Sequence, residues 1–437
     1  MFPQTRAFFL DPLALPRNHP ARVSSETKQA IKCGWYSLFG MVLCIANLAA
    51  NECEVAPLAS DRWPAAPPST NQALVTSMKN AYVAGGYDWR NATRSGAYLA
   101  NGDYLNWSVA FWDPRTGSAA TNDAAGVVMV SYDLRKTFHY NPVTIAQTAL
   151  FMHSRFMHGE ALDVNFLQYA DFLIGMQKDD GSLPYAFAVD GFEALSPGWV
   201  SGMAQGQAIS VWTRAYSVSN EVKYLTAARS AYLFMLRPAR NGGCTGNLRD
   251  LNPSLERFRM IQEYPFKIDS YTLNGSAFAL LGIYDLSAID SDAHCEFEEL
   301  AQTIRTLVSY YDIGGISTYD LRHLVSHDNP AVFPAYHMIN TVVVWALDSI
   351  DPHPELNRAW RTWAGYVGQN LPDAPVITIS RVGQILRISI ASDLPTGILR
   401  AESISKADWA VVELPQGQSF IDIDASSPTA FYRAFLK

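Results

Sequence analysis

The spacing of apolar residues is helical through the middle of the chain. From Pro142 to about Asn370, apolar residues recur three and four positions apart, with turn residues between the segments, which predicts amphipathic helices. The predicted helices cover residues 142–158, 162–178, 199–218, 221–236, 271–286, 293–311, 333–349 and 355–369. Successive antiparallel helix pairs of this length usually close, or partly close, into a ring. We therefore expect a mainly α fold, with an incomplete (α/α) toroid over residues 140–372.

Alternating apolar and polar residues predict β-structure on both sides of the helical region. Residues 127–132 alternate in this way, so we expect a small β-rich region over residues 71–139. Within the helical region, residues 257–261 predict a strand that Pro265 ends. From residue 374 onward, four short stretches bounded by Gly, Pro or Asp predict an accessory β-sandwich-like module over residues 373–437. These four stretches are residues 376–379, 386–390, 409–412 and 431–433.

Residues 1–70 contain an apolar run and a proline-rich stretch. Residues 33–50 are uncharged and follow Lys28 and Lys32, a pattern typical of a cleaved secretory signal. The same run is close to the minimum length that spans a bilayer, so a single-pass membrane anchor is the alternative, and a buried helix is a third. Residues 56–69 predict a linker. We expect a chain that is exported to the periplasm or the extracellular space, or one that is membrane-anchored.

Five cysteines leave the disulfide pattern open. Cys33 and Cys44 belong to the apolar run, and would be removed with a cleaved signal. In an exported chain, Cys244 and Cys295 could pair while Cys53 stays free. Three unpaired cysteines are the slightly favoured interpretation, because spacing alone does not determine connectivity.

The composition describes a packed globular protein that does not bind nucleic acid. Of the 437 residues, 49% are hydrophobic and 12% aromatic, against 17% charged, which excludes an intrinsically disordered chain. The formal net charge is −8, which argues against binding a duplex through its phosphates. A polyanionic substrate would therefore need a local basic pocket. The many aromatic rings suit sugars, which stack on them.

Three tyrosine-bearing segments carry the candidate chemistry. Glu263 and Tyr264 follow the predicted strand in an aromatic setting, where a carboxyl group loses hydration and its pKa rises. An ion pair of Glu263 with Arg259 or Lys267 is the alternative, and the sequence alone favours it. Residues 319–323 and 336–337 are the other two segments.

Residues 319–323 contain Tyr319, Arg322 and His323 just after two glycines, so a turn can present all three to one cavity. Arg322 carries a planar guanidinium that matches a carboxylate. Tyr336 and His337 open a predicted helix. His337 fits a satisfied core histidine as well as a substrate contact.

Two further segments could contact a sugar. The helix predicted from residue 199 is rich in small residues such as Gly202 and Gly206, so something must approach it closely. A neighbouring helix is favoured over a sugar chain in the central cleft. Gln205 on this helix is then a predicted polar group near the cleft. Tyr140 precedes the helix at Pro142, and either contacts sugar or packs on the helix start.

Taken in chain order, these segments resemble the C-terminal catalytic domain of the D-glucuronyl C5-epimerase family. The resemblance extends from about residue 126 to residue 369. It rests on the residues of the motifs and on their order along the chain, as well as on composition. The matching stretches are residues 196–210 with 214–216, 263–265, 273–275 with 282–286, 319–323 and 336–337.

The resemblance implies conversion of D-glucuronate to L-iduronate in a heparosan-like polysaccharide, by removal of the C5 proton and reprotonation on the opposite face. It implies a partial toroid whose cleft binds this anionic, glucuronate-containing polymer. The family's catalytic set corresponds to Glu263, Tyr264, Tyr319 and Tyr336. Arg322 corresponds to its substrate-carboxylate contact.

Further substrate-binding residues are predicted around this set. Tyr140 corresponds to a substrate-binding tyrosine of the family, and Gln205, His323 and His337 are predicted to bind substrate from their positions in the motifs. The chain departs from the family pattern in four places. Gln262 replaces an acid, Asn340 replaces a histidine, the large β domain of animal members is absent, and the C-terminal β module is extra.

The reaction that the resemblance implies needs no redox cofactor. The histidines lack the spacing of a metal site, and the acidic turn at residues 179–185 lacks the ligand series of a calcium loop. A structural divalent cation is therefore not indicated, and a homodimer is left open. Two alternatives remain: a polysaccharide lyase that expels the C4 group by β-elimination, and a carbohydrate-binding protein without turnover.

Overall fold

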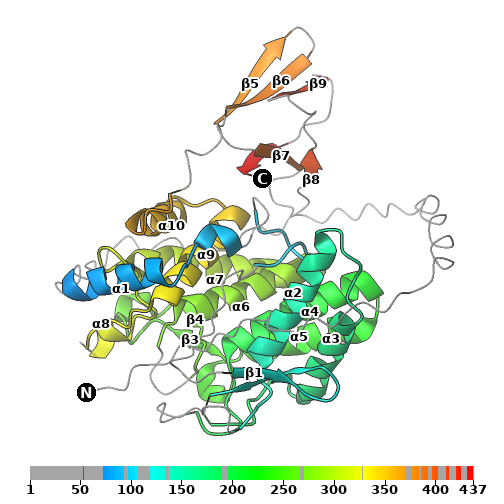
Figure 1. Ribbon diagram of the computed structural model, residues 1–437, viewed down its shortest axis with the longest axis vertical. Coiled ribbons are helices and arrows are strands. Elements are labelled where there is room, and N and C mark those ends of the chain that lie inside the picture. The colour runs from blue at the N-terminus through cyan, green and yellow to red at the C-terminus, as the bar shows by residue number, and fades with distance from the viewer. Residues whose placement is uncertain are drawn as a thin grey trace, which may run out of the picture.

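The structure is a computed structural model, and its described part is mainly helical with small antiparallel sheets (Figure 1). It describes Cys53, residues 72–92, 97–105, 119–132, 137–188, 195–265, 270–326 and 328–370, and the strands of the C-terminal region. The predicted apolar run and proline-rich linker lie outside the described residues. Among the helices of the described part, none combines the length and the apolar character that crossing a membrane requires.

The eight helices predicted from the apolar spacing are confirmed, with ends shifted by a few residues. They are α2 Pro142–Met157, α3 Asn165–Met176, α4 Gly202–Ser219, α5 Val222–Leu236, α6 Leu273–Ser287, α7 Asp292–Leu307, α9 Pro334–Ile350 and α10 Pro354–Tyr366. The 3-10 turns are η1 Trp89–Ala92, η3 Ala239–Asn241, η4 Pro253–Leu255 and η5 Val308–Tyr311.

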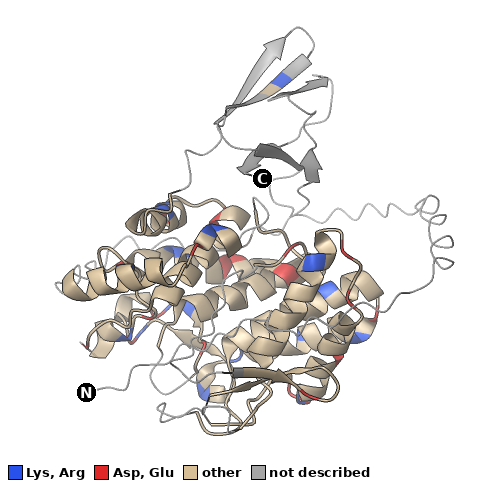
Figure 2. Cartoon of the chain, viewed as in Figure 1, with Lys and Arg blue, Asp and Glu red and all other residues tan. Residues whose placement is uncertain are grey.

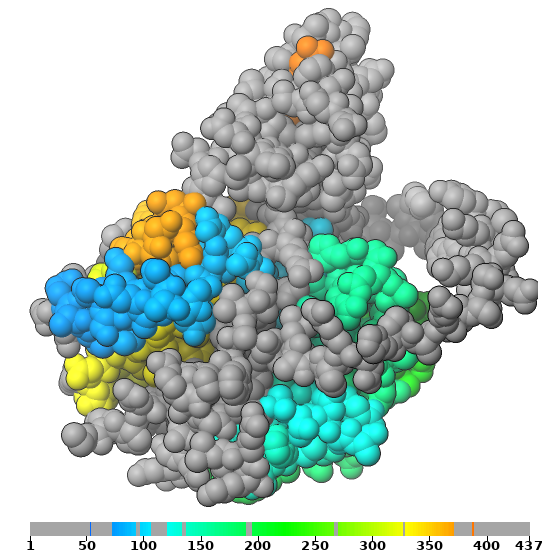
Figure 3. Space-filling model, in the orientation of Figure 1, coloured from blue at the N-terminus to red at the C-terminus, as the bar shows by residue number. Residues whose placement is uncertain are grey.

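Two helices were not predicted. The short α8 Arg322–Ser326 follows Tyr319, and α1 Gln72–Ala84 lies in the region predicted to be β-rich. That region does contain one antiparallel hairpin, β1 Ala119–Asn122 with β2 Val128–Ser131, but it begins with a helix. Figure 3 shows α1 along the outer surface of the helical body, where only Val75 and Tyr82 are buried. Because only two residues of α1 are buried, its apolar residues show little helical periodicity in the sequence.

Helices α4 and α6 form the centre of the helical body. Helix α4 packs against α2, α3, α5 and α6, and α6 packs also against α7 and α9. A Cβ atom on Gly206 of α4 would lie 2.3 Å from Ala279 Cα of α6, and one on Gly282 of α6 would lie 2.2 Å from the Gly206 carbonyl oxygen. Gly206 is therefore explained by a neighbouring helix, the favoured interpretation of the sequence, whereas a Cβ atom on Gly202 would lie 2.5 Å from the Gln262 carbonyl oxygen.

A buried ion pair also joins α4 and α6. Arg214 Nη1 lies 2.6 Å from Asp285 Oδ2, and both side chains are 0% exposed. The Tyr98 hydroxyl and the Asn101 backbone N–H donate to the two Asp285 oxygens at 2.8 and 3.0 Å. This network fixes residues 97–105 on the two central helices. In the view of Figure 2, charged residues of both signs are spread over the helices and loops.

Six C-terminal strands form two antiparallel sheets (Figure 1). One sheet has the order β5-β6-β9 and the other has the order β10-β7-β8. The strands are β5 Val376–Val382, β6 Ile385–Ala391, β7 Thr396–Ala401, β8 Ala410–Val412, β9 Phe420–Asp424 and β10 Phe431–Leu436. The four predicted strands are confirmed, and β7 and β9 are additional.

A short strand pair leads to the candidate site. Strand β3 Thr245–Asn247 pairs antiparallel with β4 Arg259–Ile261, which confirms the strand predicted there. The backbone N–H of Gln262, just beyond β4, donates to the Cys244 carbonyl at 2.7 Å. This bond extends the pairing and fixes the position of the next residue, Glu263.

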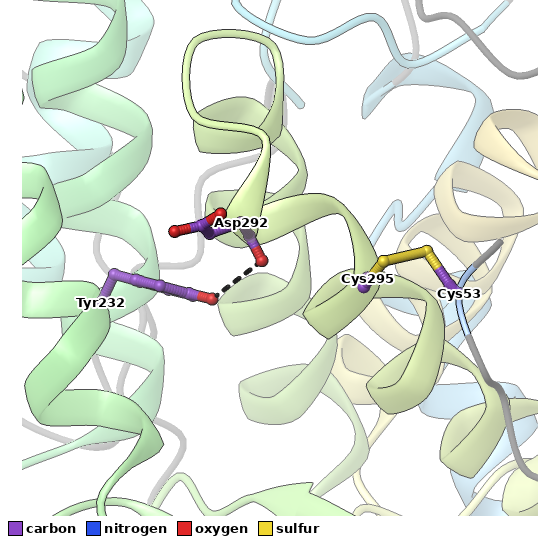
Figure 4. Close-up of a disulfide and its surroundings, with 4 residues drawn as sticks. All are labelled: Cys53, Tyr232, Asp292 and Cys295. Atoms are coloured by element: carbon purple, nitrogen blue, oxygen red, sulfur yellow. Dashed lines mark hydrogen bonds between the residues drawn. A yellow bond between two sulfur atoms is a disulfide. The ribbon is translucent and has the colours of Figure 1, made fainter. Parts of the chain in front are cut away.

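The disulfide prediction is wrong in its partners. Cys53 is bonded to Cys295 of α7, with Cα atoms 5.2 Å apart (Figure 4), and Cys244 is buried and free. Both the proposed Cys244–Cys295 pair and the favoured interpretation of three free cysteines are therefore corrected. The bonded residues lie 242 positions apart, so only the folded chain brings them together.

Candidate functional site

Three separate segments of the chain bring the candidate residues together. Glu263 and Tyr264 follow β4, Tyr319 lies in the loop between η5 and α8, and Tyr336 lies in the first turn of α9. The Tyr319 loop is held by its backbone, because its N–H donates to the Ala331 carbonyl at 2.7 Å and its carbonyl accepts from the first residue of α6 at 3.3 Å. Tyr336 therefore lies on a helix, Glu263 and Tyr264 directly follow a strand, and Tyr319 lies in a loop whose backbone is hydrogen-bonded to α6.

The four side chains form one contiguous cluster. The Tyr319 hydroxyl donates to Glu263 Oε2 at 3.1 Å and lies 3.3 Å from the Tyr264 hydroxyl. The rings of Tyr319 and Tyr336 meet edge to face, with centroids 4.4 Å apart. All four side chains are buried. Residues separated by up to 73 positions in sequence, from Glu263 to Tyr336, therefore meet in one site.

Glu263 is placed where its carboxyl group can titrate near neutral pH. Burial raises its pKa to about 7, while hydrogen bonds from Tyr264 and Tyr319 oppose the rise and nearby Asp320 adds to it. Arg259, the partner that the sequence favoured, instead pairs with Glu296 and Glu299 at 2.9 and 2.8 Å. The prediction of an Arg259–Glu263 ion pair is therefore wrong, and Lys267 lies outside the described residues.

The phenols around Glu263 keep their protons. Burial raises the pKa of both Tyr264 and Tyr319 well above the ordinary value of 10, and the nearby Glu263 carboxylate adds to the rise. At neutral pH these phenols are therefore protonated hydrogen-bond donors. Within this trio, the carboxyl of Glu263 is the group that can accept a proton at that pH.

A pocket of about 480 Å³, partly open to solvent, adjoins the cluster. Three members of the cluster line it, namely Glu263, Tyr264 and Tyr336. Nine further residues complete the lining: Tyr132, Asn141, Val143, Tyr185, Phe187, Leu195, Trp199, Ser201 and Met203. The wall is mostly aromatic and apolar, with a few polar groups, as is common for pockets that bind small molecules or sugar units.

An aromatic stack forms part of this wall. The rings of Trp199 and Tyr185 are stacked with centroids 3.6 Å apart, and Trp199 lies 6.2 Å from the Tyr264 ring. The indole N–H of Trp199 donates to the Phe187 carbonyl at 2.9 Å, so the ring orientation is fixed. The stack connects the pocket to the tyrosine cluster.

The sequence analysis did not single out these wall residues as ligand contacts. Trp199 lies in the family-like stretch of residues 196–210, which was its one signal. It follows Gly198, whose φ of +101° makes the turn that presents the indole. Asn141 caps α2, accepting from the Val143 N–H at 2.9 Å, and faces the pocket because that cap lies in the wall.

Arg322 is the first residue of α8, directly after the loop that carries Tyr319, but it has a different environment. Its side chain is 45% exposed, and its Nη2 lies 3.6 Å from Asp320 Oδ2. Asp320 is buried, and burial raises its pKa to about 6, with Arg322 opposing the rise. Arg322 is not among the pocket-lining residues. The Arg322 guanidinium, three residues from Tyr319 in the sequence, is therefore partly exposed and lies beside the buried carboxyl group of Asp320.

Tyr140 and Gln205 are placed apart from the pocket lining. The Tyr140 hydroxyl donates to Asp123 Oδ2 at 2.7 Å, and its ring packs on Phe172. Gln205 is 0% exposed, accepts from the Leu183 N–H at 2.8 Å, and donates to a glycine carbonyl in the same turn at 3.0 Å. Both side chains hold neighbouring loops in this structure.

The two predicted histidines are also buried in part or in full. His337 is 0% exposed, accepts from the Ser317 N–H at 3.0 Å and bonds to the Trp363 carbonyl at 3.2 Å. It is a satisfied core histidine, the alternative that the sequence left open. Burial lowers the pKa of His323, whose ring nitrogens are buried, and its substrate contact stays a prediction.

Asn340, a departure from the family pattern, supports the Tyr319 loop. Its side-chain amide donates to the Thr318 carbonyl at 3.0 Å and to Ser317 Oγ at 3.2 Å. In the part of the chain that the structure describes, no three His, Cys, Asp or Glu side chains gather closely enough to hold a metal ion. The need for a cofactor stays a prediction.

Comparisons with known proteins match the central part of this chain. Residues 177–365 match the family model described as D-glucuronyl C5-epimerase C-terminus. A D-glucuronyl C5-epimerase of Caenorhabditis elegans is 31% identical over 221 residues, in a match that covers 46% of this chain and 34% of that protein. The chain thus spans about a third of the length of this curated relative.

A comparison with solved structures matches a family 76 glycoside hydrolase from a bovine Bacteroides thetaiotaomicron strain. It has 13% sequence identity and a TM-score of 0.33, and the match covers 60% of this chain and 49% of that one. A similarity this low carries no argument about fold or function.

Proposed function

Residues 177–365 belong to the D-glucuronyl C5-epimerase family as its C-terminal domain, and we propose on this premise that the chain is a carbohydrate epimerase. Its substrate is a glucuronate-containing, heparosan-like polysaccharide, and its product contains L-iduronate. The observation that carries the proposal is the contact of Glu263 with the hydroxyl of Tyr319, whose ring meets that of Tyr336. In this cluster the carboxyl group of Glu263 can act as the base, the neighbouring phenols can donate protons, and all of them lie beside the same pocket.

The chemistry begins with a C5 hydrogen that is hardly acidic, because it lies beside an ionised carboxylate. Arg322 or a buried phenol first neutralises that carboxylate, since preorganised donors stabilise the charge that develops in the transition state. The Glu263 carboxylate then takes the C5 proton, and the electron pair of the C–H bond moves into the substrate carboxylate. The phenol of Tyr336 delivers a proton to the opposite face of C5, which inverts the centre.

The test is incubation with glucuronate-containing polysaccharides in heavy water, read by NMR. We expect deuterium at C5 and the appearance of iduronate. A product that absorbs in the ultraviolet would instead indicate β-elimination, because expelling the C4 group leaves a double bond. Binding of the polymer without any C5 label would indicate a carbohydrate-binding protein without turnover.

The role of Glu263 predicts a specific pH dependence. Because the base must be ionised and burial raises its pKa to about 7, kcat/KM is expected to fall as the pH drops below that value, with the slope of one proton. The measurement is the initial rate of C5 exchange as a function of pH. A profile that stays flat through neutral pH would contradict a role for Glu263 as the base.

Export is supported by the disulfide. The Cys53–Cys295 bond belongs to a class that persists mainly in oxidising compartments, which fits a cleaved signal or an anchor in residues 33–50. Peptide mapping without reduction, on protein from its native host, is expected to recover the two cysteine peptides joined. Free thiols at both positions would contradict export.

The finer architecture is part of the same proposal. Consecutive helices pack on one another, as α2 on α3, α4 on α5, α6 on α7 and α9 on α10, which supports an incomplete (α/α) toroid. Strands β5 and β10 of the two C-terminal sheets contact each other, which supports a sandwich-like accessory module. In this arrangement the pocket is the cleft that receives the polymer.

A further inference from the structure

Glu263 rests on a glycine at the start of α6. Gly275 is the third residue of that helix. A Cβ atom built on Gly275 would lie 2.4 Å from Glu263 Cβ, 2.7 Å from its Cγ and 2.5 Å from Oε2. Real Cβ atoms essentially never approach another heavy atom within 3.0 Å. The carboxylic side chain therefore occupies the space that any other residue at position 275 would fill.

Helix formation alone does not favour a glycine at this position. Alanine is preferred over glycine within a helix by about 1 kcal/mol, so the glycine lowers the stability of the first turn of α6. Gly206 and Gly282 have a different environment, because an added Cβ at either would first meet the backbone of the facing helix. Gly275, in contrast, faces the side chain of the proposed base.

The same carboxylate oxygen lies close to both Gly275 and the Tyr319 hydroxyl. Glu263 Oε2 lies 2.5 Å from the position of a Cβ on Gly275 and accepts from the Tyr319 hydroxyl at 3.1 Å. Tyr319 is also fixed relative to α6, because its carbonyl accepts from the Leu273 N–H at 3.3 Å. The first turn of α6 therefore sets the position of both groups relative to each other.

We propose that Gly275 is a positioning residue for the reaction, and that its missing side chain lets the Glu263 carboxyl lie against α6 within reach of Tyr319. This inference rests on the proposed function. A methyl group at position 275 would meet Cβ of Glu263 at 2.4 Å, and no side-chain rotation moves this atom because it is bonded directly to the backbone. Glu263 would have to move as a whole, and its oxygen would leave the position set by Tyr319.

The first test is Gly275→Ala. Because a misplacement of about 1 Å can cost on the order of 10²-fold in rate, we expect kcat for C5 exchange to fall by about that factor. KM is expected to stay within about twofold, since the eleven residues other than Glu263 that line the pocket are unchanged. The matched control is Gly282→Ala, which crowds the Gly206 carbonyl of α4. It is expected to lower Tm while kcat, measured well below Tm, is retained.

The second test separates a local clash from general damage, and it works even where Gly275→Ala folds poorly. Glu263→Gly removes all three atoms that the new methyl would meet. In that background, Gly275→Ala is expected to cause no further loss of Tm, whereas it lowers Tm in the wild-type background. Non-additivity of this kind measures a direct contact between two residues.

Chemical rescue gives a third readout. Formate added to Glu263→Gly is expected to occupy the vacated space and restore part of the exchange. The methyl of Gly275→Ala would fill that space, so the double variant is expected to lose the rescue. Rescue of equal size in both variants would show that position 275 does not face the base.

Besides equal rescue by formate, two results would overturn the inference: wild-type kcat in Gly275→Ala, or an equal loss of Tm in both backgrounds. Failure of the proposed function has a different signature. If the wild-type protein introduces no C5 label into any glucuronate polymer, the epimerase proposal fails, while the Tm cycle still reports whether position 275 holds Glu263.

Discussion

Glu263→Gln is expected to reduce C5 exchange by about 10²- to 10⁴-fold, the usual contribution of one positioned proton transfer. The amide keeps the shape of the carboxyl group, and its oxygen can still accept from the Tyr319 hydroxyl, now 3.1 Å from Oε2. It cannot take a proton from carbon. Tyr319→Phe is expected to have a loss of the same order, because it removes the hydroxyl that joins Glu263 to Tyr264.

The fold of these variants should remain intact. Glu263 has its pKa raised from the ordinary 4.5 to about 7, so the folded state holds this proton more tightly than the unfolded state. Its contribution to stability is therefore fully present below about pH 4.5 and is lost as the pH rises through 7. At pH 8, Glu263→Gln avoids burying a charge, and its Tm is expected to equal or exceed that of the wild type.

Glu299→Gln is a matched control for this substitution. Glu299 is partly exposed and pairs with Arg259, so the same chemical change there is expected to leave C5 exchange unaffected. The measurements are the initial exchange rate and a thermal melt at pH 8 for each variant. Full exchange in Glu263→Gln, or in Tyr319→Phe, would reject the role assigned to that residue.

The helices could be predicted because each leaves a repeated signal over many residues. Helices α4, α6 and α9 each run for four or more turns with apolar residues at helical spacing. Helix α1 buries only Val75 and Tyr82, so it showed little periodicity and its region was assigned to β-structure. The Cys53–Cys295 bond was out of reach for a different reason, because it depends on how α7 packs in the folded chain.

The site was predicted from motif order, and the raised pKa of Glu263 from its aromatic setting, but the environments of the other side chains were not. The spacing of Glu263, Tyr319 and Tyr336 in the sequence does not require them to meet. They are brought together by the packing of α6 and α9 and by the backbone hydrogen bonds of the intervening loop. Gln205 was predicted to lie near the cleft because it is on the helix rich in small residues. Helix α4 is surrounded by other helices, so Gln205 satisfies its amide on buried backbone groups instead.

The largest loss of stability is expected from Asp285→Ala. Removing one partner of a buried ion pair typically costs about 3–5 kcal/mol, because the other charge stays buried without compensation. Here Arg214 would be left 0% exposed beside the hydroxyl of Tyr98. In a domain of 150–250 residues each kcal/mol lowers Tm by about 2–4 °C, so a thermal melt will resolve the effect.

A double variant distinguishes the lost charge balance from lost packing. Arg214→Met with Asp285→Leu replaces both charges by apolar groups of similar size, and such replacements are often neutral or stabilising. It is therefore expected to be more stable than Asp285→Ala alone. Glu256→Ala, which breaks the exposed pair with Arg249, is expected to change stability by less than about 1 kcal/mol. If the double variant were as unstable as Asp285→Ala, the hydrogen bonds to Tyr98 and Asn101, rather than the charge of Arg214, would be what holds α4, α6 and residues 97–105 together.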